Sequence, residues 1–282
     1  MARAKLALAV VGHGRAGRAR VRVLEDHPRA KLGALVRREP KLGERTLEQV
    51  LEDPAIDGLI LCTPNRLHAS ATRVALEHGK HVLVEFPLAE TRVEGAALFE
   101  QARRRERVLQ VEHIELLSLS QQYQRERVGR LGRPIGGGLV FSGRSRGWIA
   151  DAELAGSPAL RAVARLHRLL DLFGEASART AQLTPAGAAG YRLEVELSFR
   201  AGGVAWLYEE RGADLEREMR WAVRCEQGEL IDPPDLPREG LFREDLDHFI
   251  ERVEGRELEP YVSEARVLHV LEVVGQIDGL IS

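Results

Sequence analysis

The sequence predicts an α/β protein with an N-terminal Rossmann domain on a parallel sheet and a C-terminal α+β domain on a large, mostly antiparallel sheet. Three observations lead to this fold class. Short apolar strands alternate with helical segments up to about residue 118, which is typical of parallel βαβ units. A glycine motif, GHGRAG, follows the first of these strands. Beyond residue 118 the segments are longer and alternate apolar with polar residues. We therefore expect one domain at residues 1–118 and a second at 119–282.

The first domain should alternate strands with helices along its whole length. Thr46 is a typical N-cap, and Gly79 a typical helix terminator. The expected strands are residues 5–11, 31–36, 57–63, 81–85 and 107–113, and the expected helices are residues 18–26, 46–53, 68–80 and 91–107.

The second domain should be an antiparallel meander with helices. Turn residues AGG and RGAD separate neighbouring strands and favour hairpins. The expected strands are residues 136–146, 192–201, 203–212 and 215–228, and the expected helices are residues 159–174, 242–255 and 263–281. The helix at 159–174 should cover one face of the sheet.

Composition excludes several classes of protein. The formal net charge of −2 gives no reason to expect a nucleic-acid or membrane-surface partner. No apolar run reaches the roughly 20 residues that a transmembrane helix needs. Cys62 and Cys225 are too few for a disulfide scaffold and lack metal-site spacing, so we expect no metal and a reducing, cytoplasmic location.

The glycine motif predicts a dinucleotide site. Gly12 permits a tight turn, Gly14 lets backbone approach a pyrophosphate, and Gly17 lets the helix pack on the strand. The start of the following helix then offers N–H groups to the phosphates. The predicted site also includes the intervening residues His13, Arg15 and Ala16.

The end of the second strand predicts a preference for NADPH. An NAD site normally places a carboxylate there, on the ribose hydroxyls. Here the strand is followed by Arg37 and Arg38, and a guanidinium offers a bidentate fork to a 2′-phosphate. Ordinary solvated arginines are the alternative interpretation, and Glu39 one residue further leaves NADH use open.

Two further loops should border the cofactor. The first follows the third strand, and we predict that it contributes Cys62, Thr63, Pro64, Asn65 and His68. His68 fits a first-turn helix residue better than a catalyst. The second loop brings Glu85, which should organise the cofactor loop, and Phe86.

Three of these segments, GHGRAG, CTPNRLH and GKHVLVEFPLA, together resemble the glucose-fructose oxidoreductase/inositol dehydrogenase superfamily. Within it, VGHGRAGRARVR, VRRE, HGKHVLVEFP, VEHIELL and RLHRLLDLFGE resemble the biliverdin reductase A family nearly from end to end. That resemblance implies NAD(P)H-dependent reduction of biliverdin to bilirubin, by a monomer. Some members of the family bind zinc through a Cys-rich tail, but the tail here has His269 and no cysteine, so no zinc is implied.

The resemblance also shows what is missing. The superfamily has a lysine in its active site where this chain has Phe86, and a Tyr is common there in the biliverdin reductase A family. Ala164 and Leu160 fall near the superfamily's His and Asp positions. Oxidising an alcohol without these groups is improbable. Biliverdin instead accepts hydride at a conjugated carbon, and only a pyrrolic nitrogen must gain a proton. An apolar ring at Phe86 is then acceptable, although simple packing is an equally good interpretation of it.

Arginines are the main candidates for substrate contacts. We predict that Arg165 relays a proton or holds a propionate, and that Arg161, one helical turn earlier, lies on the same side. Arg168 should face solvent, whereas Arg217 on the sheet could hold a propionate. A plain surface charge is the alternative interpretation for each except Arg165.

The segment after the fifth strand adds two more candidates, Glu112 as a catalytic group and His113 as a substrate contact. The catalytic set predicted from the sequence is therefore Arg165, Phe86 and Glu112. Two other functions fit the same residues: another NADPH-dependent reductase of a conjugated imine or enone, and a non-enzymatic nucleotide sensor.

Overall fold

A computed structural model describes the chain except for residues 1–3, 40, 188–189, 235, 257–258 and 282. The chain divides into two compact units, each made of two stretches of sequence. Unit 1 comprises residues 1–114 and 240–268, and unit 2 comprises residues 115–239 and 269–282.

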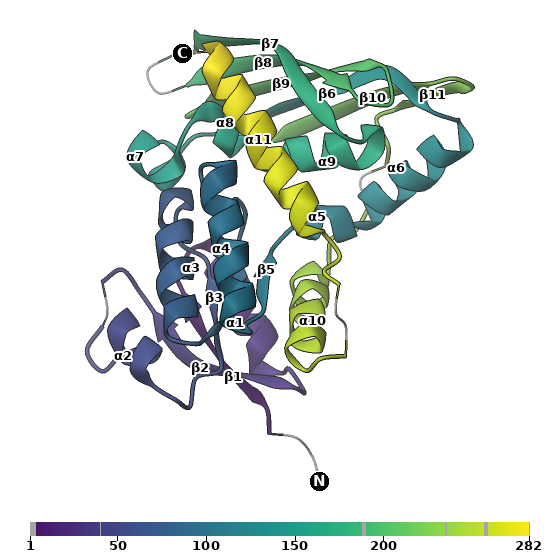
Figure 1. Cartoon of the computed structure of the whole chain (residues 1–282). Helices are drawn as coiled ribbons and strands as arrows, with labels where there is room; N and C mark the ends of the chain where they lie inside the picture. Colours follow the sequence, from purple (N-terminus) through teal and green to yellow (C-terminus); the bar gives the residue numbers. More distant parts are fainter. Residues whose placement is uncertain (1–3, 40, 188–189, 235, 257–258, 282) are drawn as a thin grey trace. The chain divides into compact units, whose positions relative to one another are not determined.

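Unit 1 is built on a five-stranded sheet of order β2-β1-β3-β4-β5, in which every pair of neighbours is parallel (Figure 1). The strands are β1 (Leu6–Val11), β2 (Ala30–Val36), β3 (Gly58–Leu61), β4 (His81–Val84) and β5 (Leu109–Val111). The helices are α1 (Arg15–Glu25), α2 (Leu47–Glu52), the 3₁₀ turn η1 (Asn65–Leu67), α3 (His68–Glu77), α4 (Arg92–Arg104) and α10 (Leu241–Val253). The predicted Rossmann sheet is confirmed. The strand order reverses beside β1, and ligands of such sheets bind at that point, beyond the carboxyl ends of the strands.

Local sequence explains these elements well. The residues of β3 are buried on both faces, which is why the strand is a continuous apolar run. Thr46 caps α2 as predicted: its side chain accepts from the backbone N–H of Gln49, whose side chain accepts from the Thr46 N–H in return.

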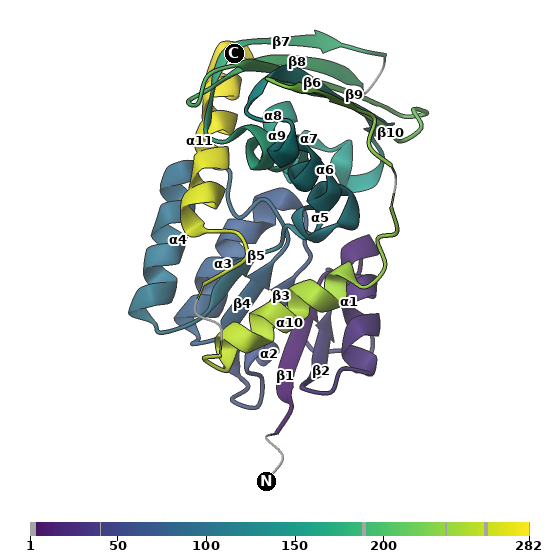
Figure 2. The same cartoon turned by 90° about the vertical axis from the view of Figure 1, so that its right-hand side faces the viewer.

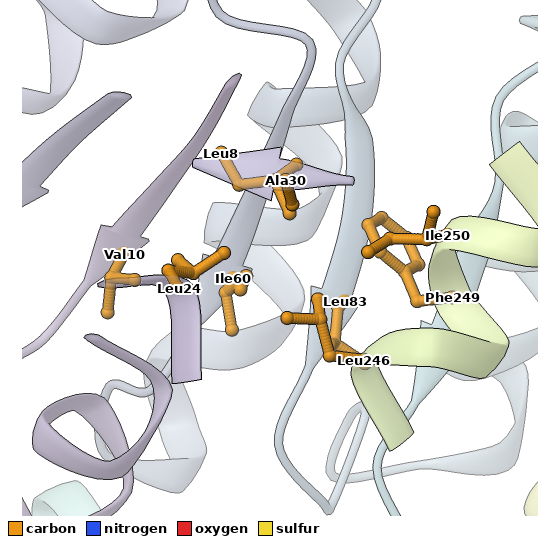
Figure 3. Close-up of a cluster of buried hydrophobic side chains, with 9 residues drawn as sticks. All are labelled: Leu8, Val10, Leu24, Ala30, Ile60, Leu83, Leu246, Phe249 and Ile250. Atoms are coloured by element: carbon orange, nitrogen blue, oxygen red, sulfur yellow. The ribbon is translucent and has the colours of Figure 1, made fainter. Parts of the chain in front are cut away.

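Helix α10 belongs to unit 1 although it follows nearly all of unit 2 in the chain. Its residues Leu246, Phe249 and Ile250 are fully buried and pack with side chains from the sheet, including Leu83 (Figure 3). The expected division at residue 118 placed α10 in the second domain, whereas the structure places it in unit 1. The reason is that the apolar face of α10 covers the Rossmann sheet.

Unit 2 is built on a six-stranded sheet of order β11-β10-β6-β9-β8-β7. The strands are β6 (Pro134–Arg144), β7 (Ala176–Pro185), β8 (Tyr191–Phe199), β9 (Val204–Gly212), β10 (Glu218–Cys225) and β11 (Gly228–Ile231). The helical segments are α5 (Ile114–Leu117), which begins at the last residue of unit 1, α6 (Leu119–Arg130), η2 (Gly147–Ile149), α7 (Ala152–Ala155), α8 (Pro158–Arg161), α9 (Val163–Phe173) and α11 (Glu264–Ile281), which passes from unit 1 into unit 2. Helices α6, α8 and α9 lie on one face of the sheet (Figure 2).

The sheet is mostly antiparallel, as predicted, but the meander is wrong. The hairpin at AGG forms between β8 and β9, whereas RGAD forms none, because β6 lies between β9 and β10 and runs parallel to β9. The polar edge strand β7 and the short β11 were also missed. In β7 the residues after Ala176 are mostly exposed, so no apolar alternation marks the strand.

The predicted helix at 159–174 is two helices that meet at Ala162. Ser157 caps α8 by accepting from the Leu160 N–H, and Pro158 occupies its first turn. Ala162 ends α8 and precedes α9, so Arg161 and Arg165 lie on different helices.

Candidate active site

The glycine loop between β1 and α1 has the geometry of a dinucleotide site. Gly12 has φ +100°, and a Cβ there would lie 2.4 Å from the Cys62 carbonyl oxygen. A Cβ on Gly17 would lie 2.0 Å from the Gly12 carbonyl oxygen, so α1 approaches the loop too closely for any other residue. Beside Gly14 there is open space, and no side chain caps α1. The first N–H groups of α1, from Arg15 onward, therefore fit a pyrophosphate.

Arg37 is held against the glycine loop. Its Nε donates to Glu44 Oε1 at 2.8 Å, and its Nη1 contacts Nδ1 of His13. Burial and then the charge of Arg37 lower the pKa of His13, so the ring is neutral and can accept this bond. Arg38 is exposed. Both arginines thus follow the end of β2 as predicted.

The loop after β3 is tied to the segment that contains Phe86. His68 is the first residue of α3 and is 1% exposed. Its Nδ1 lies 2.7 Å from the Pro87 carbonyl oxygen and its Nε2 2.8 Å from that of Thr63. Burial lowers the pKa of His68, so the ring is neutral and donates to one of the two carbonyls. Since both ring nitrogens face backbone carbonyls, His68 holds these two loops together.

A buried cluster of acids surrounds a single arginine that sequence reasoning missed. Arg20 on α1 is fully buried and donates from Nε and Nη2 to Glu85 Oε1, at 3.0 and 2.9 Å. Its Nη2 also lies 2.6 Å from Asp245 Oδ2 on α10. Tyr261 donates to Asp245 Oδ1 at 2.8 Å and accepts from the His113 N–H. The chain thus brings strand ends and α10 together around one cation.

Glu112 belongs to the same cluster and is fully buried. Burial, followed by the charges of Glu85 and Asp245, raises the pKa of Glu112 well above its usual range. Its Oε1 accepts from the Ile114 N–H at 2.7 Å. The carboxyl group therefore keeps its proton to a higher pH than an ordinary glutamic acid does.

Phe86 and His113 stack within unit 1. Their ring centroids lie 6.1 Å apart at an interplanar angle of 17°. Burial, with Arg266 nearby, lowers the pKa of His113 to about 3. The ring is therefore uncharged at neutral pH, and a contact of His113 with a propionate cannot be an ion pair.

In unit 2, Arg165 is clamped by a buried carboxylate that the sequence did not single out. Its Nε and Nη2 donate to Glu209 Oε2 at 2.9 and 2.7 Å, and Nη2 also reaches Oε1 at 2.9 Å. Arg211 donates to Glu209 Oε1 at 2.8 Å, and both guanidinium groups lie over the ring of Phe141. Although burial alone would raise it, these two cations lower the pKa of Glu209. Arg161 lies beside this group, since its backbone carbonyl accepts from Arg165 Nη2.

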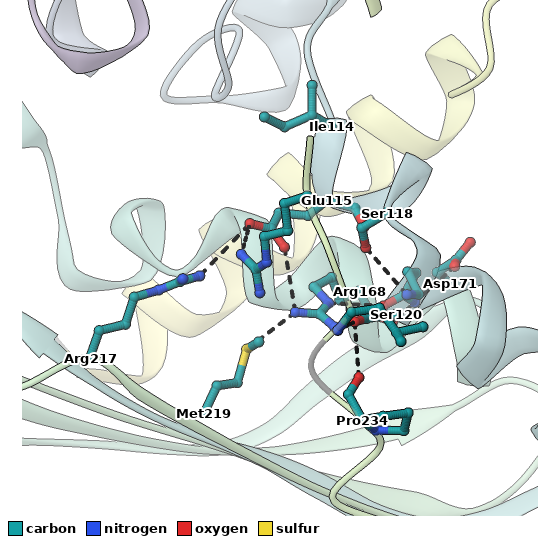
Figure 4. A network of polar contacts seen from close by, with 12 residues as sticks. Ile114, Glu115, Ser118, Ser120, Arg168, Asp171, Arg217, Met219 and Pro234 are labelled. Carbon is teal, nitrogen blue, oxygen red and sulfur yellow. Dashed lines mark hydrogen bonds and ion pairs between the residues drawn. The ribbon is translucent and has the colours of Figure 1, made fainter. Parts of the chain in front are cut away.

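Arg217 belongs to a separate cluster in unit 2, around Glu115 (Figure 4). Arg168 joins it, and the prediction that Arg168 faces solvent is wrong. Arg168 is only 2% exposed, its Nε donates to Gln121 Oε1 at 2.8 Å, and its guanidinium lies over the Trp221 ring. Helix α9 is covered by the sheet and by α6, so nearly all of its surface is buried.

Two classes of site find no support in the described residues. They contain no group of three or more His, Cys, Asp or Glu side chains placed to hold a metal ion. Nor does any helix in the described part of the chain have the length and apolarity that a bilayer crossing requires.

Comparison with known proteins identifies the family. Residues 6–113 match the family model described as "Oxidoreductase family, NAD-binding Rossmann fold", and residues 129–237 match "Biliverdin reductase, catalytic". Biliverdin reductase A of Mus musculus is 32% identical over 291 residues, which cover 98% of this chain and 96% of that protein. The chain belongs to the biliverdin reductase A family. The human biliverdin reductase A is 29% identical and also aligns over nearly the full length.

Solved structures agree on the fold. The crystal structure of biliverdin reductase from Synechocystis sp. PCC 6803 in complex with biliverdin and NADP⁺ superposes with a TM-score of 0.88 at 24% identity. The alignment covers 98% of this chain and 99% of that one. GenD2, crystallised with NAD, superposes with a TM-score of 0.86 at 19% identity. The biliverdin reductase fold therefore extends over both units.

Proposed function

We propose that this member of the biliverdin reductase A family reduces biliverdin to bilirubin, with NADPH as the preferred reductant and NADH as a weaker one. The observation that carries the proposal is the near-full-length match to biliverdin reductase A, including the catalytic family model over unit 2. The Synechocystis relative, crystallised with biliverdin and NADP⁺, supports both ligands.

Unit 1 provides what the cofactor requires. The open side of Gly14 and the uncapped start of α1 would hold the pyrophosphate, while Arg37 and Arg38 would hold the 2′-phosphate. When bound, the nicotinamide supplies a hydride, which adds to the central methine carbon (C10) of biliverdin. Phe86 presents an apolar ring, which limits water near the transferred hydride.

The other candidate residues would donate one proton to the substrate and bind its two propionate groups. Reduction at a conjugated carbon leaves a pyrrolic nitrogen that must gain a proton, and the buried Glu112, whose pKa is raised, is the acid that unit 1 offers. Arg165 is held in one orientation by Glu209, so it suits recognition of a propionate or of the substrate's electron-rich oxygen atoms. Arg161 and Arg217 provide further positive charge.

The decisive assay mixes the protein with NADPH and biliverdin and follows the visible absorption change to bilirubin. Formation of bilirubin at a rate proportional to enzyme concentration supports the proposal. No bilirubin, together with turnover of a different conjugated imine or enone, would assign the chain to another reductase.

Two variants test the mechanism further. Phe86→Tyr should keep turnover within a few-fold of wild type, since no step uses a hydroxyl group there. Arg165→Ala should cut turnover about 100-fold by removing an oriented cation. An unchanged rate in Arg165→Ala would show that this cation has no role in the reaction.

A further inference from the structure

Unit 2 contains a cavity of about 200 Å³, and Arg217 is the one residue of its described lining that the proposed reaction uses. Residues of helices α6 and α9 and of strand β10 line it, together with residues 232–234 and Arg238. Ser120 holds the segment around Pro234 in place, because its hydroxyl donates to the Pro234 carbonyl and accepts from the Leu236 N–H. Pockets that take a whole drug-sized ligand are roughly 300–1,000 Å³, so this cavity suits one arm of a larger molecule.

Buried polar groups in the cavity wall have no partner among the described residues. Gln124 is fully buried, and neither its amide oxygen nor its amide nitrogen makes a hydrogen bond there. The indole N–H of Trp221, itself 4% exposed, is in the same position. Leaving such a group unsatisfied costs about 1–3 kcal/mol, and folded proteins rarely tolerate it without a reason. Two hydrogen-bond donors, Gln124 Nε2 and Trp221 Nε1, are thus available to a ligand.

Arg168 adds an under-used cation. A guanidinium has five N–H donors, yet within the described residues Arg168 makes one hydrogen bond to oxygen, with Gln121, and one to the sulfur of Met219. Its Nη1 lies 3.6 Å from Glu115 Oε2, beyond hydrogen-bond distance. The guanidinium carbon of Arg168 lies over the Trp221 ring, 4.8 Å from its centroid, and this contact and the bond to Gln121 hold the group in place.

Three guanidinium groups border this cavity among the described residues. Arg168, Arg217 and Arg238 all approach a single carboxylate, Glu115, at 3.6, 3.8 and 2.9 Å (Figure 4). Burial lowers the pKa of Arg168 to about 10, and the charges of Arg238 and Arg217 act in the same direction against the opposing effect of Glu115. Asp232, an acidic residue in the wall, accepts from the Trp221 backbone N–H. A ligand that enters this cavity should therefore be an anion.

We propose that this cavity binds one carboxylate group; the identity of that group rests on the proposed function, under which it is a propionate of biliverdin. The flat guanidinium of Arg168 faces a planar carboxylate well, and the Gln124 amide and the Trp221 indole donate to its oxygen atoms. Arg217 and Arg238 compensate its charge. The cavity thus selects an arm that ends in a carboxylate over a neutral ester of the same shape.

The Trp221 indole N–H reports directly on the cavity. In ¹⁵N-labelled protein its signal is identified by its loss in Trp221→Phe, and it is followed while biliverdin, biliverdin dimethyl ester or sodium propionate is added. We expect biliverdin to shift the signal and the dimethyl ester to leave it unchanged. If propionate shifts it and biliverdin does not, the assignment to the substrate is overturned. If neither does, the cavity is not a carboxylate site.

Kinetics provide a second test with a matched pair of glutamines on α6. Gln124→Met keeps the volume and removes the amide, and Gln122→Met makes the same change at an exposed position. We expect the Michaelis constant for biliverdin to rise about 10-fold in Gln124→Met alone, and that for the dimethyl ester to stay constant in both. Equal constants for biliverdin in the two variants would overturn the proposal.

Two further measurements separate the possible failures. A merely structural role for Gln124 would lower the melting temperature of Gln124→Met, whereas an unpartnered amide can be removed without loss of stability. If wild-type protein forms no bilirubin, the proposed function fails. The indole response to sodium propionate then still decides whether the cavity takes a carboxylate.

Discussion

Glu209 offers a sharp test of the polar core of unit 2. The substitution Glu209→Gln removes one negative charge with little change of shape. Glu209 is fully buried, and it pairs with Arg165 and Arg211, whose side chains are each 11% exposed. Removing one partner of a buried ion pair costs about 3–5 kcal/mol, because the other charge is left uncompensated. The Gln oxygen still accepts one hydrogen bond, so we expect the lower end, about 3 kcal/mol.

Chemical denaturation and thermal melting both measure this loss. At roughly 2–4 °C per kcal/mol for a domain of this size, the melting temperature should fall by about 6–12 °C. The control is Glu210→Gln on the same strand, where the exposed partner Arg192 leaves little to lose. Turnover should fall in Glu209→Gln as well, because Arg165 loses its bidentate anchor, while the Michaelis constant for NADPH should stay constant.

The lowered pKa of Glu209 also predicts how the stability of the protein changes with pH. The folded protein lowers the pKa of Glu209 below its usual value, so the carboxylate stabilises the fold above the unfolded pKa of about 4.3. That contribution is lost as the pH falls through the folded pKa. The difference in stability between wild type and Glu209→Gln should therefore be full at pH 7 and should shrink below about pH 4. A Glu209→Gln protein as stable at pH 7 as Glu210→Gln would refute this account of the cluster.

Three other predictions concern unit 1. Arg37→Ala combined with Arg38→Ala should raise the Michaelis constant for NADPH at least about 10-fold more than that for NADH, since only NADPH carries the 2′-phosphate; equal losses would remove the phosphate role. Gly17→Ala should destabilise the protein, because its Cβ would lie 2.0 Å from a backbone oxygen. Gly14→Ala, where a Cβ meets open space, should melt like wild type but bind NADPH more weakly in a fluorescence titration. Normal NADPH binding by Gly14→Ala would argue against phosphate contact at Gly14. If Glu112 is the proton source, wild type should lose activity as the pH rises through the raised pKa of this carboxyl. Glu112→Gln should have a lower turnover and should not show this loss. An unchanged pH–rate profile in the variant would exclude Glu112 as the proton source.

The same carboxyl should also affect stability, with the opposite sign to Glu209. Its folded pKa lies above the unfolded one, so its favourable contribution is complete only below about pH 4.3 and is lost as the pH rises through the folded pKa. As the pH rises above about 4.3, wild-type protein should therefore lose stability more steeply than Glu112→Gln, which equilibrium unfolding at several pH values would measure.

The Rossmann half could be predicted from the sequence because its signals are local. A parallel strand buried on both faces is a continuous apolar run, as in β3, and the glycine spacing sets the turn between β1 and α1. The sheet of unit 2 is harder, since β6 pairs with β9 and β10, which lie far along the chain. Nothing in the RGAD turn shows that a strand from elsewhere will occupy the place beside β9.

The ion pairs of the candidate site were also hard to predict, because their partners lie far apart in the sequence. Arg165 could be chosen from its position on a helix, but Glu209, which orients it, lies 44 residues away and looks like any polar residue on a strand. Arg20 and Asp245 are 225 residues apart in the sequence and meet because α10 returns to unit 1. The prediction that Arg168 faces solvent was wrong for a different reason. Helix α9 is covered on two sides, so its helical periodicity does not mark an exposed face.

The distribution of charge argues for the direction of the reaction. In unit 1, three carboxyl groups, from Glu85, Glu112 and Asp245, surround the cation of Arg20 among the described residues, and the pKa values of Glu85 and Glu112 are raised. A carboxyl that is already protonated cannot take a proton from an alcohol, which dehydrogenation would require, but it can give one to a nitrogen after hydride addition. In unit 2, by contrast, three guanidinium groups, from Arg168, Arg217 and Arg238, approach Glu115. A reductase of a dianionic, conjugated substrate needs both features, one acid to complete the reduction and several cations to hold the carboxylates.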